Sequence, residues 1–231
     1  MKLAFYYHTP VFKNKDDIFC PGYIGVFIDS LARHANEVIL IMHSLEEMTV
    51  ESDYRLTGKN ISLIDLSIKT PAWHRLLFHK SILQNKLKSL TDIDIFLIRA
   101  PSPLAPFFYK YVDVNRIRFY IIGDYISTLE NIRIENPRDI LLKLFLFFND
   151  MLLNKQIRKS DIIVNSSALV CKYKSKCKSV KLIKTTTLSD NDFYYRTDTC
   201  TKKNIKILYT GRIEKAKGLF ELIEAFQKII I

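Results

Sequence analysis

The chain has 231 residues, of which 48% are hydrophobic and 26% charged, a balance typical of a folded protein with a sizeable core rather than a disordered one. Its formal net charge of +11 lies entirely in residues 153–217, which hold 16 Lys and Arg against 5 Asp and Glu, while the remainder holds 19 of each. This basic segment suits phosphate groups or an anionic membrane. Nucleic acid is not expected as a partner, because no known binding module accompanies the charge.

The sequence gives no sign of a secretory leader, a membrane span or a metal site. The four cysteines lack CxxC spacing and have no His near them in sequence, which favours reduced thiols and no metal. The first apolar run is broken by His8 and Pro10, unlike a signal peptide. The most apolar stretch, residues 140–153, is shorter than the about 20 residues of a spanning helix. We therefore expect a cytoplasmic protein, with peripheral contact at the inner face of a membrane left open.

Apolar runs of strand length alternate with helical patterns along the chain. The predicted strands are at residues 2–8, 37–43, 61–67, 94–100, 119–125, 161–167 and 180–184. The predicted helices are at residues 24–34, 73–90, from about 106, and 137–159. Because the apolar runs are continuous, as in strands buried on both faces, we predict an α/β fold with a Rossmann-like parallel sheet. Right-handed crossovers would place helices on both faces of this sheet.

Ligands of such sheets bind at the carboxyl ends of the strands, near the point where the strand order reverses. The loops after the first, fourth and fifth predicted strands, residues 8–23, 99–106 and 123–126, therefore hold the candidate residues. His8 is one of them, and both a partly exposed histidine and a position facing the cleft remain open for it.

A second unit follows a polar, non-periodic linker at residues 197–204, so we predict domains at 1–198 and 199–231. The second domain begins with a strand, KILYT, and continues through Gly211 and Arg212 to Lys217, Gly218 and an amphipathic helix. The planar fork of Arg212 suits a diphosphate, Lys217 lies at a helix entry that favours anions, and the two glycines allow close approach. An ordinary strand–helix turn with solvated cations is the alternative.

The stretch GRIEKAKGLFELIEAF, residues 211–226, resembles the GR…KG…LIEAF signature that opens the C-terminal domain of GT-B glycosyltransferases of the family 4 type (glycosyl transferases group 1). The resemblance implies that Arg212 and Lys217 bind the diphosphate of a nucleotide sugar, with Gly211 and Gly218 in the same donor-phosphate site. The first domain resembles the acceptor domain of this family in its order of elements. IRAPSP (98–103) and IIGDY (121–125) resemble an Arg-x-Pro-Ser-Pro pattern and a Gly-Asp pattern of one subgroup.

On this resemblance the acceptor would lie across the strand ends, near Gly22, Arg99, Ser102 and Asp124. Asp124 is the candidate catalytic residue, because it can accept a proton from an acceptor hydroxyl or hydrogen-bond the sugar. Arg99 can pair with a phosphate or with Asp124. The structural alternatives stay open for both: a turn cap for Asp124 and an ion pair at a strand end for Arg99.

The implied activity is transfer of a sugar, with retention of configuration, from a nucleotide-sugar donor to a saccharide or lipid-linked acceptor in polysaccharide or glycolipid biosynthesis. The family mechanism requires no metal, and no cofactor is expected beyond the donor substrate. The distal Glu-x7-Glu motif of the family is missing, so we expect a truncated, incomplete second Rossmann-like domain. Whether the chain is an enzyme alone therefore stays open: a second chain could supply the missing domain, or the protein could be a non-catalytic remnant or acceptor-binding module.

Overall fold

A computed structural model describes residues 1–126, 129, 132, 134–184, 208–211, 213 and 218–229. The chain divides into two compact units, Met1–Thr187 and Leu188–Ile231, and each is treated by itself. The predicted boundary between residues 198 and 199 lies outside the described residues.

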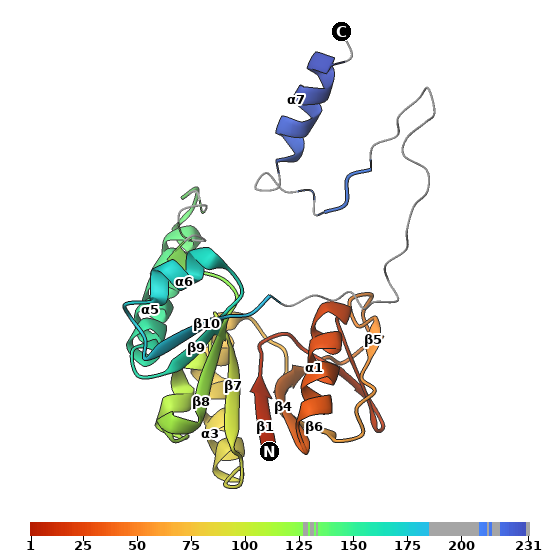
Figure 1. Ribbon diagram of the computed structural model, residues 1–231, viewed down its shortest axis with the longest axis vertical. Helices are drawn as coiled ribbons and strands as arrows, with labels where there is room; N and C mark the ends of the chain where they lie inside the picture. The colour runs from red at the N-terminus through yellow and green to blue at the C-terminus, as the bar shows by residue number, and fades with distance from the viewer. Residues whose placement is uncertain are drawn as a thin grey trace. The chain divides into compact units, whose positions relative to one another are not determined.

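The first unit is built on a seven-stranded parallel sheet with the strand order β10-β9-β8-β7-β1-β4-β6 (Figure 1). Its strands are β1 (Lys2–Tyr6), β4 (Glu37–Ser44), β6 (Ile61–Ile68), β7 (Ile95–Ala100), β8 (Ile117–Ile121), β9 (Asp161–Val164) and β10 (Ser179–Leu182). All seven predicted strands are confirmed within a few residues, and the Rossmann-like α/β class with them. The central strands β1, β4, β7 and β8 form the buried middle of the sheet because their apolar residues lie on both sides of the pleat.

The helical elements pack on both faces of this sheet. They are α1 (Gly22–His34), α2 (Ala72–His74), η1 (Arg75–His79), α3 (Lys80–Lys88), η2 (Ala105–Lys110), η3 (Val114–Arg116), α5 (Pro137–Ile157) and α6 (Ser167–Tyr173). The segment expected to be helical from about residue 106 is the short 3-10 helix η2, and α6 was not predicted. The helix α5 begins with a capping box, in which the Asn136 and Asp139 side chains each accept a backbone N–H of the other's segment.

Alternate residues of β1 feed two separate cores. One core lies between the sheet and α1 and contains Leu3, Phe5, Ile24, Ile28, Leu40 and Met42. The other lies between the sheet and α3, α5, α6 and η2 and contains Ala4, Tyr6, Ile41, Leu83, Phe108, Leu153 and Ile157. Burying each such side chain stabilises the fold by about 1.5–3 kcal/mol, so the sheet is held from both sides.

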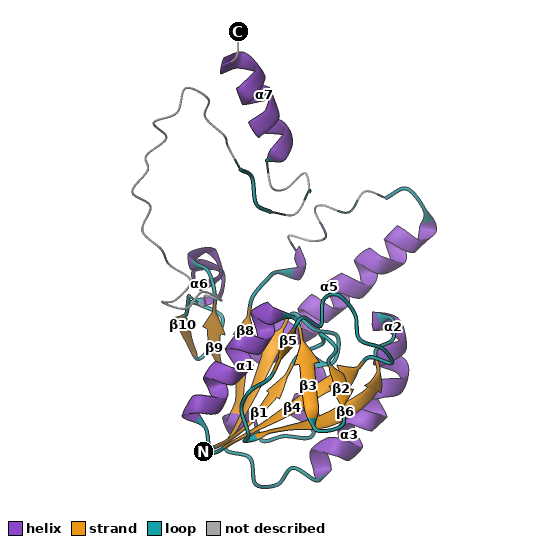
Figure 2. Cartoon of the chain, turned by 90° about the vertical axis from the view of Figure 1, so that its right-hand side faces the viewer, coloured by secondary structure: helices purple, strands orange, loops and turns teal. Residues whose placement is uncertain are grey.

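A small antiparallel sheet covers part of the α1 face and was not predicted from the sequence. It consists of β2 (Phe12–Asn14), β3 (Asp17–Cys20) and β5 (Tyr54–Arg55), which lie beside β4 and β6 (Figure 2). Through Val11, Ile18 and Cys20 it closes the core beneath the loop that follows β1.

The described part of the second unit consists mainly of α7 (Leu219–Ile229), which confirms the predicted helix. Gly218 precedes it with a φ of +67°, a left-handed backbone that glycine adopts without steric cost. Of the predicted strand KILYT, residues 206–210, only 208–210 are described, and they are described without strand structure.

Candidate functional site

The strand order reverses at β1, which places the candidate site. β1 pairs with β4 on one side and with β7 on the other, so the chain builds the sheet outward from β1 in both directions. In an open parallel sheet the crevice at such a reversal, at the carboxyl ends of the strands, is where ligands bind. Tyr7 and His8 follow β1 at this edge, and Arg99 lies near the end of β7.

Arg99 lies among tyrosine rings. Its guanidinium carbon is 4.2 Å from the centroid of the Tyr7 ring, 5.7 Å from that of Tyr23 and 5.8 Å from that of Tyr120. These distances allow cation–π attraction, which fixes the guanidinium without neutralising its charge. Its Nε atom is buried and has no hydrogen-bond partner in the described part of the chain.

Asp124 is engaged with its own fold. Its Oδ1 atom is 2.5 Å from Nζ of Lys172 on α6, and the same oxygen accepts the backbone N–H of Ile126 at 3.0 Å. The turn cap, which was the structural alternative for Asp124 in the sequence analysis, is therefore present. The ion pair with Lys172 joins the loop after β8 to α6, a partner that the sequence does not predict.

Gly22 and Ser102 are also used internally. The Gly22 N–H, in the first turn of α1, donates to Asp53 Oδ1 at 2.8 Å. Ser102 is 1% exposed, and its hydroxyl donates to the Tyr6 hydroxyl at 2.8 Å inside the core. Burial raises the pKa of Tyr6 to about 12, so this pair stays protonated. In this structure Ser102 supports the loop after β7 from within and does not reach the surface.

Two basic side chains that the sequence did not mark as candidates, Arg75 and His43, lie with His8 and Arg99 at the same edge of the sheet. Arg75, on η1, is 6% exposed, and its Nη1 donates to the His8 carbonyl oxygen at 3.4 Å. The Arg75 Nε, the His8 Nδ1 and the His43 Nε2 are buried and without a hydrogen-bond partner among the residues described. His8 follows β1 and His43 lies near the end of β4, so three neighbouring segments contribute. We call Arg75, His8 and His43, together with Arg99, the basic cluster.

Burial and positive neighbours keep the two histidines neutral. Burial, and after it the positive charges of Arg75, Lys69 and Arg99, together lower the pKa of His8 to about 4. Burial and Arg75 likewise lower the pKa of His43 to about 4, although its contact with the Ser67 carbonyl acts in the opposite direction. The His43 Nδ1 lies 3.2 Å from that carbonyl and donates to it, so the neutral ring presents a lone pair at Nε2.

The basic cluster therefore offers both kinds of hydrogen-bonding group in a partly desolvated place. Among the residues that the structure describes, the Arg75 Nε–H is a charged donor without an acceptor, and the His43 Nε2 is an acceptor without a donor. A buried cation without a carboxylate is costly unless a ligand satisfies it. A π-helical turn such as Arg75–His79 is also frequent at functional sites. This arrangement suits a ligand that carries both a negative charge and hydroxyl groups.

The sequence does contain a signal for this cluster. His43 ends a strand that is otherwise apolar, where a polar residue marks the carboxyl edge of the sheet. Residues 66–91 contain His74, Arg75 and His79 and no Asp or Glu, so a cation of this helix that becomes buried has no acid nearby in sequence. What the sequence does not show is which helix face turns inward.

Comparison with known proteins gives no assignment: no protein-family model and no curated protein matches this sequence. Within the described ranges, no group of three or more His, Cys, Asp or Glu side chains could hold a metal ion. Of the helices that the structure describes, none is both long enough and apolar enough to cross a bilayer.

Of the four predicted donor-phosphate residues, Gly211 and Gly218 are among those that the structure describes. Arg212 and Lys217 lie outside the described residues. Gly211 is described, and a Cβ there would come within 2.9 Å of the Tyr209 hydroxyl, so a larger residue would require the Tyr209 side chain to move. The left-handed Gly218 at the entry to α7 likewise suits a close turn before a helix.

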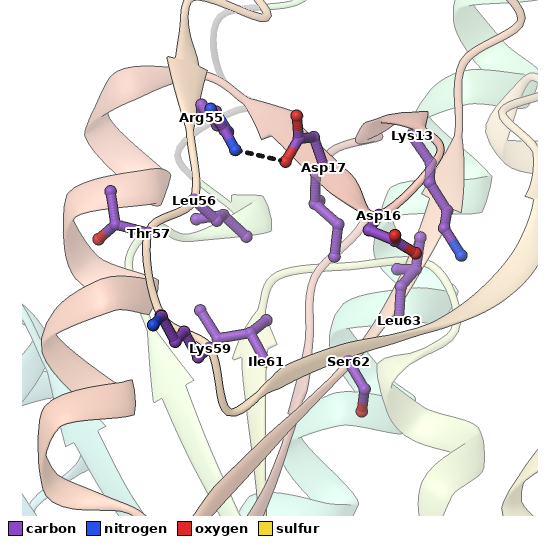
Figure 3. Close-up of a pocket in the computed structure, with 12 residues that line it drawn as sticks. Lys13, Asp16, Asp17, Arg55, Leu56, Thr57, Lys59, Ile61, Ser62 and Leu63 are labelled. Carbon is purple, nitrogen blue, oxygen red and sulfur yellow. Dashed lines mark ion pairs between the residues drawn. The ribbon is translucent and has the colours of Figure 1, made fainter.

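A pocket of about 790 Å³ lies away from the basic cluster, at the amino end of β6. It is lined by Lys13, Asp16, Asp17, Ile18, Arg55, Leu56, Thr57, Gly58, Lys59, Ile61, Ser62 and Leu63 (Figure 3). Its charges compensate one another, since Arg55 Nη2 and Asp17 Oδ1 form an ion pair at 2.7 Å. We place the candidate site at the carboxyl edge instead, because unsatisfied buried groups gather there.

Proposed function

We propose that this chain carries the acceptor side of a GT-B glycosyltransferase of the family 4 type and the opening strand–helix unit of its donor domain. The observation that carries the proposal is the basic cluster, which lies where the strand order of a Rossmann-like sheet reverses. Unused charged donors beside an unused acceptor suit a hydroxylated, negatively charged ligand, as sugar phosphates and nucleotide sugars are. The GR…KG segment adds a second, independent feature of the same family.

In this proposal each unit binds a different substrate. Arg212 and Lys217 bind the diphosphate of the nucleotide-sugar donor, and Gly211 and Gly218 leave room for it. The saccharide or lipid-linked acceptor lies at the carboxyl edge, with Arg75 and Arg99 toward its negative charge and the neutral His43 toward a hydroxyl. Transfer proceeds with retention of configuration and without a metal.

A non-catalytic binding module is the second candidate, and specific contacts favour it. Asp124, the predicted catalytic residue, forms an ion pair with Lys172 and caps its own turn. A carboxylate held by a lysine is a weaker proton acceptor than a free one, because the positive charge stabilises its ionised form. A chain of this kind would bind an acceptor and leave transfer to a second polypeptide that supplies the remaining donor site.

Calorimetric titration of the purified chain with UDP and GDP tests the proposal. We expect binding that weakens by roughly 1–3 kcal/mol in Arg212→Ala and in Lys217→Ala, because each would lose a charge-assisted phosphate contact. Arg33→Ala, at an exposed position of α1, is the matched control and should bind like the unaltered chain. Absence of binding up to millimolar nucleotide would rule out an autonomous donor site and leave the binding-module alternative.

A further inference from the structure

The helix α5 is apolar on two sides, and only one of them is covered. Its buried residues all lie from Leu146 onward, namely Leu146, Asn149, Asp150, Leu153 and Ile157. Large apolar side chains are exposed along most of its length, namely Ile140, Leu141, Leu142, Leu144, Phe147, Phe148, Met151 and Leu152. At 100° per residue most of these form a stripe opposite the buried one. The first turns of α5 also project beyond the sheet (Figure 2).

A second helical segment extends the same apolar surface. Trp73 of α2 is 59% exposed, and Leu77 and Phe78 of η1 are also exposed. An apolar pocket of about 520 Å³ joins this segment to α5, with Ala72, Trp73, Arg138, Leu141, Leu142 and Phe145 in its lining. The two segments therefore form one continuous surface, which we call the α2–α5 face. It is larger than the scattered apolar residues of an ordinary monomer surface.

The charges that accompany this face are mainly positive. Residues 69–88 and 134–159 together contain 10 Lys and Arg and 3 Asp and Glu. Two of the three acids do not offset these cations at the surface: Asp139 accepts the backbone N–H of Asn136, and Asp150 is buried. Exposed cations stand at both ends of α5, with Arg138 in its first turn and Lys155 in its last, followed by Arg158 and Lys159. The occupant must thus be apolar in its middle and negatively charged at its edge.

We propose that the α2–α5 face docks the protein on an anionic lipid membrane. Apolar side chains on a helix flanked by cations are the pattern by which helices lie in the membrane interface, with the rings and aliphatic chains below the headgroups. A helix in the plane of the interface does not need the length of a spanning helix. A second copy of the chain fits less well, because symmetric pairing would bring the same cations against one another.

The single tryptophan of the chain provides a direct test, because Trp73 belongs to the proposed docking face. The experiment is to record its emission while adding vesicles of phosphatidylglycerol mixed with phosphatidylcholine, or of phosphatidylcholine alone. We expect a shift to shorter wavelength with the anionic vesicles, since the indole leaves water. The shift should be much smaller with the neutral vesicles and should weaken as salt is added.

Matched variants separate this face from general surface apolarity. The double variant Leu141→Gln with Phe148→Gln removes two exposed side chains of the face, and we expect about tenfold weaker vesicle binding. Met48→Gln with Val50→Gln removes two exposed apolar side chains elsewhere and should bind as the unaltered chain does. A charge variant, Lys155→Glu with Arg158→Glu, tests the same face without altering its apolar residues.

Three outcomes would overturn the proposal. The first is an emission spectrum of Trp73 that anionic vesicles leave unchanged. The second is equal vesicle binding by the face variants and the Met48/Val50 control. The third is emission that shifts with protein concentration in the absence of lipid, which would identify a second copy of the chain as the occupant. None of these measurements depends on nucleotide binding, so the docking proposal and the proposed function can fail separately.

Discussion

Two buried charged side chains of this molecule differ in how many hydrogen bonds they make with the surrounding chain. Asp29 on α1 is 3% exposed, and its carboxylate accepts hydrogen bonds from the Tyr54 hydroxyl, the Thr57 hydroxyl and N–H, and the Gly58 N–H, all within 3.1 Å. Arg75 on η1 is also buried, at 6% exposed, but within the described residues it makes one long hydrogen bond, at 3.4 Å, and its Nε has no partner.

This difference separates a structural charge from one available to a ligand. The loop after β5 satisfies Asp29 completely and in turn is held against α1 by it. Nothing in the described residues satisfies Arg75 in the same way, although leaving a buried cation partly unpaired costs stability. Buried groups that their own fold does not satisfy are therefore the better indication of function here, and the contrast predicts different results for removing the two charges.

The largest expected effect on stability follows from removing Asp29. Asp29→Ala leaves the Tyr54 hydroxyl, the Thr57 hydroxyl and two backbone N–H groups without their acceptor, and we expect a loss of about 3 kcal/mol in the free energy of unfolding. Urea denaturation followed by circular dichroism measures it. Asp53→Ala is the control, since the exposed Asp53 accepts a single N–H in the first turn of α1 and should cost about 1 kcal/mol. Similar losses in both variants would contradict the structural role given to Asp29.

A smaller effect is expected from acidification. His43 is 0% exposed and has a pKa lowered to about 4, mainly by burial and then by Arg75. The unfolded chain binds a proton there below about pH 6.5, whereas the folded chain does so only near pH 4. The free energy of unfolding is therefore at its full value above pH 6.5 and falls as the pH drops toward 4, by about 2 kcal/mol at pH 5 for this one histidine.

Denaturation at pH 8 and pH 5 measures this loss. In His43→Asn the difference between the two pH values should shrink by about the same amount, because the variant removes the group that must bind the proton. His34→Asn, at an exposed position of α1, should leave the difference unchanged. A pH dependence that persists unaltered in His43→Asn would show that another group is responsible.

The fold was predictable to a larger extent than the site. The seven strands of the main sheet were found because each is a short run rich in apolar residues. The central strands β1, β4, β7 and β8 are buried on both faces, whereas the edge strands β6 and β10 are mostly not buried. The small sheet was missed because β2, β3 and β5 are three, four and two residues long and carry no periodic pattern. β2 pairs with β3 across a tight turn, with Asn14 opposite Asp17, and only the pairing of β3 with β5 joins segments that are distant in the sequence.

The site was harder because burial of a charge is decided by packing between distant segments. Arg99 and Asp124 were placed correctly at the carboxyl edge, since strand ends can be read from the sequence. The ion-pair partner of Asp124 could not be predicted, because Lys172 lies on a helix 48 positions further along the chain. Arg75 looked like an ordinary helical cation, and only the packing of η1 under the loop after β1 shows it as buried.

The smallest expected effect on stability, and the most informative about function, comes from removing the charge of Arg75. Arg75→Met replaces a partly unpaired buried cation by an apolar side chain of similar length, so we expect the free energy of unfolding to change by no more than about 1 kcal/mol.

The same substitution should abolish stabilisation by an anion. For the unaltered chain we expect inorganic pyrophosphate at about ten times its Kd to add about 1.4 kcal/mol, measured by thermal unfolding at constant ionic strength. The exposed Arg33→Met controls for loss of a positive charge. Arg75→Met could instead lower the free energy of unfolding by several kcal/mol and keep the stabilisation by pyrophosphate. Arg75 would then be a structural charge like Asp29, and the proposed difference between the two residues would be wrong.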